Sequence, residues 1–201
     1  MTRRSALVSL TIPLAIVPLA ALAISGCEPS AMASGGASVG IAVAQERSIG
    51  AAVDDTIIAS QIVSNFYQFD IELLRLVSAE VVEGRVLLTG NVPNPVNRVD
   101  AVRVTWQVDG VTEVLNEIQV SNQTGLKDFA LDLWISTQFR TKLLLDKDIR
   151  AINYNVETVN RVIYLIGIAR SELELKRITN HARTIENVQK VISHVRILGA
   201  N

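Results

Sequence analysis

Residues 76–91 read LVSAEVVEGRVLLTGN, two stretches rich in aliphatic and β-branched side chains around a polar pair at 83–84. Residues 153–168 read NYNVETVNRVIYLIGI and repeat the pattern, with Asn-Arg at the turn. Two such runs joined by a two-residue polar turn predict a β-hairpin. The sequence therefore predicts two hairpins, and the glycine late in each second strand favours a bulge or a close approach of another backbone segment.

The two hairpins belong to a longer internal repeat with an offset of 77 residues. No insertion separates the copies, which span about 57–120 and 134–197, although their identity is low. Self-similarity at a fixed offset indicates a repeated structural unit. The positions that match across the repeat include Ile58 with Ile135, Glu80 with Glu157, Leu88 with Leu165, Gly90 with Gly167, and Val114 with Val191.

Each copy begins with an amphipathic helix, because apolar residues recur every four positions. Ile58, Ile62 and Phe66 form this stripe in the first copy and Ile135, Phe139 and Leu143 in the second, so we expect these six side chains in the cores.

A second helix follows each hairpin. Asn94-Pro95 supplies a helix cap with proline in the first turn, and Ser171 with Glu174 has the spacing of a capping box. These helices are expected to end near 109–110 and 186–187, and last strands near 112–120 and 189–198 complete each copy.

The predicted fold is α+β, with two tandem α-β-β-α-β domains at 47–122 and 123–201, each with a mixed three-stranded sheet. Trp106 lies on the second helix of the first copy, and a contact between the domains is the expected role of its side chain.

The N-terminus has the layout of a secretory signal. Two arginines precede an apolar run from Ala6 to Ile24, and Cys27 is the sole cysteine of the chain. A transmembrane helix is the alternative, although two prolines interrupt the run. Ile24-Ser25-Gly26-Cys27 resembles the lipobox of bacterial lipoproteins, which implies cleavage before Cys27 and lipidation of its thiol. Residues 1–26 are thus a predicted signal peptide, and residues 27–46, rich in Ala, Ser and Gly, a flexible tether.

Charge and composition argue against nucleic-acid binding and catalysis. The net charge of 19 − 20 = −1 becomes 17 − 20 = −3 once Arg3 and Arg4 are removed, which leaves no global positive field. Only two histidines occur, His181 and His194, at a spacing that suggests no metal pair, and Asp55 is expected to favour the positive start of the first helix. We expect no enzyme, no metal and no cofactor other than the covalent lipid.

The repeated unit resembles the BON domain family. The resemblance rests on the α-β-β-α-β order, the glycines that end the hairpins (VLLTG and IYLIG) and the closing VDGVTEVLNEI, which is looser in the second copy. Tandem copies behind a lipobox are similar to lipoproteins of the DolP type. This resemblance implies an outer-membrane lipoprotein facing the periplasm that supports envelope integrity. It also implies binding of anionic phospholipid, such as phosphatidylglycerol, by the first helix of the second domain.

The residues of that helix support such a surface. At about 100° per residue, a second set of side chains lies away from the core stripe, and basic residues flank it. The predicted phospholipid-binding residues are Leu133, Trp134, Thr137, Arg140, Thr141, Leu144, Leu145 and Lys147. Burial of Trp134 and Leu144 against the first copy is the structural alternative. A protein adaptor that uses this face or Trp106 to bind an envelope partner, and a spacer without a ligand, are the functional alternatives.

Overall fold

The computed structural model describes residues 49–121 and 125–199. The predicted signal peptide, Cys27 and the tether lie outside the described residues, as does the expected domain boundary between 122 and 123. No helix in the two described ranges is both long enough and apolar enough to cross a membrane.

The first domain keeps the predicted order and adds one short helix, α3, between the first helix and the hairpin. Its elements are α2 (Ile49–Phe69), α3 (Ile71–Leu76), β1 (Val77–Val82), β2 (Arg85–Val92), α4 (Pro95–Thr105), β3 (Glu113–Asn116) and β4 (Gln119–Val120). The carboxylate of Asp70 accepts a hydrogen bond from Glu72 N and so caps α3.

The second domain repeats this order, with a 3₁₀ turn in place of α3. Its elements are α5 (Leu126–Leu145), η1 (Ala151–Asn153), β5 (Tyr154–Val159), β6 (Val162–Ala169), α6 (Glu172–Arg183) and β7 (Lys190–Ile197). The α+β fold with two α-β-β-α-β units is therefore confirmed. Both second helices end earlier than expected, at Thr105 and Arg183, and turns occupy the residues that follow them.

Both sheets are mixed, as predicted. The second strand of each hairpin lies in the middle: β1–β2 and β5–β6 are antiparallel, whereas β2–β3, β2–β4 and β6–β7 are parallel. The expected last strand of the first copy is divided into β3 and β4. The side chain of Asn116 accepts a hydrogen bond from Ile118 N at this point, whereas β7 continues through the equivalent residues.

Each hairpin turn is held by an aspartate of the preceding helix. All four turn residues have positive φ, between 49° and 71°, as two-residue hairpin turns require. The carboxylate of Asp55 accepts hydrogen bonds from Glu83 N and Gly84 N, both at 2.9 Å. Asp132 does the same for Asn160 N and Arg161 N, both at 2.7 Å. Since 132 − 55 = 77, this is a repeated device, and it replaces the helix-start role expected for Asp55.

The hairpin glycines allow the close backbone approach that was predicted. A Cβ at Gly90, where φ is +132°, would lie 2.0 Å from the carbonyl oxygen of Leu76. A Cβ at Gly167 would lie 2.2 Å from the carbonyl oxygen of Asn153.

The predicted caps are confirmed, with one change in the second domain. Asn94 accepts a hydrogen bond from Val96 N, and Ser171 accepts one from Glu174 N. The expected return bond of a capping box is replaced, because Glu174 accepts from the backbone nitrogens of Arg150 and Arg170.

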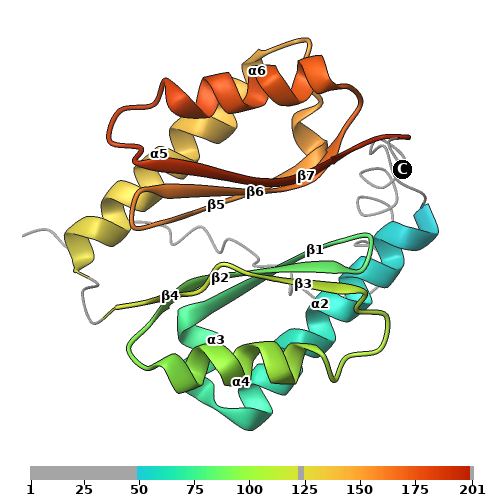
Figure 1. The fold of residues 1–201 in the computed structure, drawn as a ribbon, viewed down its shortest axis with the longest axis vertical. Helices are drawn as coiled ribbons and strands as arrows, with labels where there is room; N and C mark the ends of the chain where they lie inside the picture. The colour runs from blue at the N-terminus through green and yellow to red at the C-terminus, as the bar shows by residue number, and fades with distance from the viewer. Residues whose placement is uncertain (1–48, 122–124, 200–201) are drawn as a thin grey trace, which may run out of the picture.

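The helices of each domain cover one face of its sheet, and the core lies between these layers. The predicted stripe residues are fully or almost fully buried there: Ile58, Ile62 and Phe66 in the first core, and Ile135, Phe139 and Leu143 in the second. The other faces of the two sheets meet each other (Figure 1). A third apolar cluster fills this interface, with Val82 and Leu87 from the first domain and Tyr164, Ile166 and Ile168 from the second.

Polar contacts show that the interface has approximate two-fold symmetry. Glu117 and His194 are equivalent positions, 77 residues apart, and they contact each other at 2.9 Å. Arg196 contacts Glu83 at 3.2 Å, and the equivalent residues Gln119 and Asn160 contact each other at 2.7 Å. In a two-fold arrangement, a contact between residue i of one domain and residue j of the other recurs between the residue equivalent to j and the residue equivalent to i.

Trp106 takes no part in the apolar cluster at this interface. It caps the end of α4 and is half exposed. Because α4 lies on the helical side of its sheet, away from the other domain, the expected inter-domain role of Trp106 is wrong (Figure 1).

Candidate functional site

The second apolar side of α5 is exposed to solvent. Leu144 and Leu145 are 74% and 77% exposed, Leu133 is 57% exposed and Trp134 is 42% exposed. Burial of Trp134 and Leu144 against the first domain is therefore contradicted. Their neighbours Ile135, Phe139 and Leu143 fill the core, so the helix is apolar on both its buried and its exposed sides.

Two threonines in the middle of this surface bond to their own helix. The hydroxyl of Thr137 donates to the carbonyl oxygen of Leu133, and that of Thr141 donates to the carbonyl oxygen of Thr137, both at 2.8 Å. We call the surface formed by Leu133, Trp134, Thr137, Thr141, Leu144 and Leu145 the α5 face. It is a mainly apolar surface because these hydroxyls already have partners.

The apolar surface extends further along the helix than sequence reasoning indicated. Helix α5 begins at Leu126, and Leu126 and Phe129 in its first turns are 89% and 70% exposed. The predicted phospholipid-binding residues begin at Leu133, so both residues were missed. The run LKDFA at 126–130 could have indicated them, because Leu126 and Phe129 continue the apolar pattern of the helix towards the N-terminus.

The two predicted basic residues differ in their surroundings. Lys147 is exposed just beyond the end of α5. Arg140 donates a hydrogen bond to the carbonyl oxygen of Val156 and forms an ion pair with Glu157 at 3.5 Å, while about half of its side chain stays exposed. Lys147 is thus the more available cation, and Arg140 can reach an anion only by sharing its charge with Glu157.

A shallow groove of about 330 Å³ borders the α5 face. Its walls come from α5, η1 and β5 and are lined mostly by apolar side chains, with Arg140 at the rim: Arg140, Leu143, Leu144, Ala151, Ile152, Tyr154 and Val156. An apolar groove with one cation at its edge suits a ligand that joins an aliphatic part to an anionic group.

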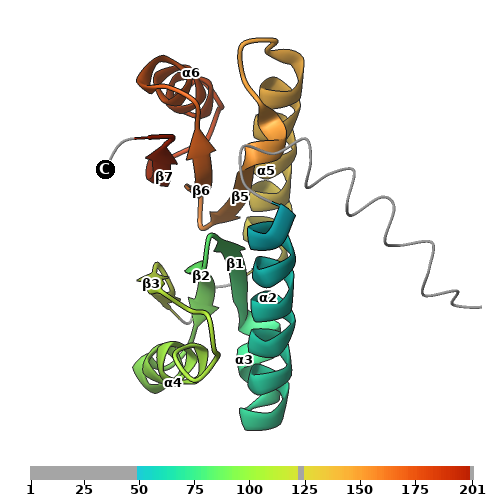
Figure 2. The same ribbon diagram turned by 90° about the vertical axis from the view of Figure 1, so that its right-hand side faces the viewer.

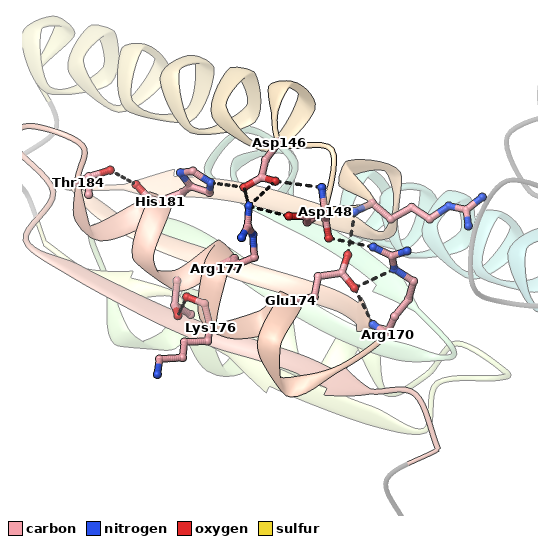
Figure 3. A network of polar contacts seen from close by, with 10 residues as sticks. Asp146, Asp148, Arg170, Glu174, Lys176, Arg177, His181 and Thr184 are labelled. Carbon is pink, nitrogen blue, oxygen red and sulfur yellow. Dashed lines mark hydrogen bonds and ion pairs between the residues drawn. The ribbon is translucent and has the colours of Figure 1, made fainter.

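The C-terminal end of α5 is held by an ionic network, shown in Figure 3. Asp146 accepts hydrogen bonds from Arg177 at 2.9 Å and contacts His181 Nε2 at 2.7 Å, and Arg177 also pairs with Asp148. The hydrogen bond from Arg177, followed by that from His181, holds the pKa of Asp146 well below its usual range. This network ties α5 to α6, which fixes the orientation of the α5 face relative to its domain.

Two carboxylates, those of Glu80 and Glu157, lie at the domain interface near Arg140 of α5. Glu80 accepts a hydrogen bond from Asn155 Nδ2 at 2.6 Å. Burial, followed by the negative charge of Glu157, raises the pKa of Glu80, and burial also raises the pKa of Glu157. The positive charge of Arg140 lowers the pKa of both carboxyls and so opposes these shifts. Arg140 therefore interacts with charged groups at the domain interface, although about half of its side chain is exposed.

No cluster of metal-ligating side chains occurs within residues 49–121 and 125–199. Each histidine has a carboxylate partner: His181 contacts Asp146, and His194 contacts Glu117. The contact of His181 connects α6 to the end of α5, and the contact of His194 connects β7 to the segment between β3 and β4 of the first domain. Both histidines therefore have structural roles.

Comparison with known proteins finds the same repeated unit elsewhere. The family model described as "BON domain" matches residues 73–122 and 132–199, one match in each repeat. The chain is 30% identical over 187 residues to outer membrane lipoprotein DolP of Haemophilus influenzae, which covers 92% of this chain and 95% of the relative.

Two further relatives match about three quarters of this chain. An uncharacterized protein in the gshII 5′ region of Anaplasma centrale is 39% identical over 146 residues, which covers 72% of this chain and 95% of the relative. A 21 kDa hemolysin of Actinobacillus pleuropneumoniae is 32% identical over 148 residues, with 73% and 75% covered.

Proposed function

Because the chain belongs to the BON domain family, we propose that it is a non-enzymatic lipoprotein of the bacterial outer membrane. Its two domains face the periplasm, and the α5 face binds anionic phospholipid such as phosphatidylglycerol in support of envelope integrity. The similarity to outer membrane lipoprotein DolP over 92% of the chain supports the location. The lipobox that ends at Cys27 supports a covalent lipid anchor.

The observation that carries the lipid proposal is the exposure of a helix side that combines tryptophan with large aliphatic residues. Trp134, Leu144 and Leu145 are each more than 40% exposed on one helix. Amphipathic helices lie in the membrane interface with such a side in the acyl boundary, where tryptophan is favoured. Lys147 at the helix end supplies a charge that attracts anionic headgroups.

The anchor and the helix have different roles by magnitude. An acyl chain contributes about 0.8 kcal/mol per buried CH2, so a lipid on Cys27 would hold the chain at the membrane. Each large side chain of α5 contributes about 1.5–3 kcal/mol if fully buried. The helix would therefore select the lipids or the site rather than provide the attachment.

Vesicle binding tests the lipid proposal. Both cores lie within 49–199, so a fragment of residues 28–201 keeps the folded unit without the anchor. This fragment should sediment with phosphatidylglycerol vesicles more than with phosphatidylcholine vesicles, and Trp134→Glu should abolish the difference. Val99→Glu is the matched control, because Val99 is 65% exposed on α4. Equal binding by a Trp134→Glu fragment with a native circular-dichroism spectrum would refute the proposal.

A second candidate function rests on an exposed apolar surface of α4. Val99 and Trp106 are seven residues apart, on one side of the helix, and both are at least half exposed. This surface fits an adaptor role in which α4 binds an envelope protein. Photo-crosslinking from position 106 in cells, compared with position 134, tests it: a discrete protein adduct at 106 supports the adaptor role, and its absence argues against it.

A further inference from the structure

Helices α2 and α5 lie in one layer on the same side of the molecule. In Figure 2 they form a single column, with the sheets beside it and α4 and α6 on the opposite side. In Figure 1 the same two helices both lie behind the sheets and run in opposite directions. The two views therefore agree that one side of the molecule is covered by the first helices of both domains.

The approximate two-fold axis passes through this layer. Glu117 and His194 are equivalent residues in contact, so the axis passes close to them. Exchange of the two domains in Figure 1 corresponds to a half-turn about an axis along the line of view, because the first domain lies below the second with its helix α2 reversed. A half-turn about such an axis leaves the outward direction of the layer unchanged. Residues of α2 that are equivalent to the α5 face consequently point outward on the same side.

Those equivalent residues form a second exposed surface, which we call the α2 face. The equivalents of the six residues of the α5 face are Thr56, Ile57, Ser60, Ser64, Tyr67 and Gln68, and Val53 lies on the same side one turn earlier; all seven are exposed. Ile57 is equivalent to Trp134 and Tyr67 to Leu144, and they are 49% and 65% exposed. The α2 face thus has the position of the α5 face with smaller and more polar side chains.

We propose that the α2 face is a second membrane-contact surface, so that the protein docks through both first helices with its approximate two-fold axis perpendicular to the bilayer. This inference rests on the proposed lipid binding by α5 and extends it to the first domain. Helix α2 contains no lysine or arginine, so its contact with lipid is apolar. Anionic headgroups are then selected at α5, and α2 adds insertion without selection.

The bilayer is the occupant that the geometry favours. The α2 face continues the layer that carries the α5 face, and a flat bilayer can contact both helices at the same time (Figure 2). The proposed anchor agrees with this placement, because Cys27 precedes the first residue of α2 by 49 − 27 = 22 positions. The flexible tether predicted from composition would have a root-mean-square span of about 25 Å at this length, which would keep the start of α2 near the membrane.

Site-specific labelling tests this proposal. The fragment of residues 28–201 contains no cysteine, so single cysteines can carry an environment-sensitive fluorophore. Positions 57 and 67 report on the α2 face, and position 134 reports on the α5 face. Val99→Cys and Leu173→Cys are matched controls on α4 and α6, where the native side chains are 65% and 69% exposed.

With phosphatidylglycerol vesicles, the fluorophores at 57, 67 and 134 should shift to shorter wavelength and be quenched by lipid-bound quenchers. Those at 99 and 173 should remain accessible to iodide. Ile57→Ser with Tyr67→Ser should weaken vesicle binding at least about tenfold, equally for all anionic fractions.

Three outcomes would overturn the inference. If position 134 shifts while 57 and 67 behave like 99 and 173, the α2 contact fails and the proposed function stands. If position 134 is also unchanged, both fail. If the shifts at 57 and 67 depend on protein concentration and occur without vesicles, a second copy of the chain covers the α2 face instead of the bilayer.

Discussion

Leu87→Ala should weaken the packing between the two domains without opening the core of either. The Leu87 side chain is 1% exposed and lies in the inter-domain cluster with Tyr164 and Ile166. Truncation of a buried leucine to alanine costs about 2–5 kcal/mol, because apolar contacts are lost and a cavity remains. Leu88→Ala is the matched control: Leu88 is 0% exposed, neighbours Leu87 in β2 and faces the core of the first domain.

The assay uses the two tryptophans as separate reporters. Trp106 lies in the first domain and Trp134 in the second, so variants that keep only one of them report on one domain each. In urea the parent fragment should show coincident transitions, because the shared interface couples the domains. Leu87→Ala should lower the free energy of unfolding by about 2–5 kcal/mol and separate the two midpoints more than Leu88→Ala does.

If Leu87→Ala lowers the free energy of unfolding by less than about 1 kcal/mol, Leu87 is not buried between the two sheets as described, because truncation of a fully buried leucine costs more than this. If the two midpoints separate no more than in Leu88→Ala, the interface does not couple the domains.

Four further results are expected. Burial raises the pKa of Glu80 above its ordinary value of 4.5, so the folded protein holds this proton more tightly than the unfolded chain does. The free energy of unfolding should therefore fall as the pH rises from 4.5 towards neutrality. Urea titrations at several pH values should show a flatter slope for Glu80→Gln. Asp132→Ala should cost about 1–3 kcal/mol, because two turn nitrogens lose their acceptor, and thermal unfolding measures this. Glu174→Ala should destabilise by a similar amount for the same reason, whereas Glu172→Ala, at an exposed neighbour, should not. In cells, Cys27→Ala should abolish incorporation of labelled palmitate into the full chain, and unchanged labelling would refute lipidation at Cys27.

Much of the fold was predictable because each element could be examined twice. The stripe of Ile58, Ile62 and Phe66 recurs 77 residues later, and both stripes are buried. The hairpins were predictable from nearby sequence: the positive φ values are required within the two-residue turns, and Gly90 and Gly167 allow the start of the same hairpin to approach closely.

The packing of the domains was not predictable for a physical reason. A sheet of this fold buries one face under its helices, and the sequence does not show whether its other face meets solvent or a second sheet. The side chains of Leu87 and Tyr164 fit either role, and only the structure shows that they contact the same cluster. Asp55 and Asp132 were missed as turn acceptors because the 28 residues between donor and acceptor leave no local pattern.

The candidate lipid surface was predictable in outline, because a helix that is apolar on two sides packs on both sides or contacts a ligand or a membrane with the second. Trp134, Leu144 and Leu145 are all exposed, as that argument required. Arg140 was harder to predict, since its ion pair with Glu157 depends on the hairpin that packs against α5.

The repeat explains how one helix could acquire the proposed lipid-binding surface while the fold stayed intact. The core stripe and the turn-holding aspartate occupy one side of each first helix, and their equivalents are kept in both copies. Ile57 and Trp134, on the other side, belong to neither core cluster, so they can differ while both cores are kept. Because the two-fold arrangement directs both of these sides outward together, a more apolar residue on α2 should increase membrane binding without altering stability. Ser60→Leu tests this: it should strengthen vesicle binding and leave the thermal midpoint of the fragment unchanged, and weaker binding would contradict the shared orientation of the two helices.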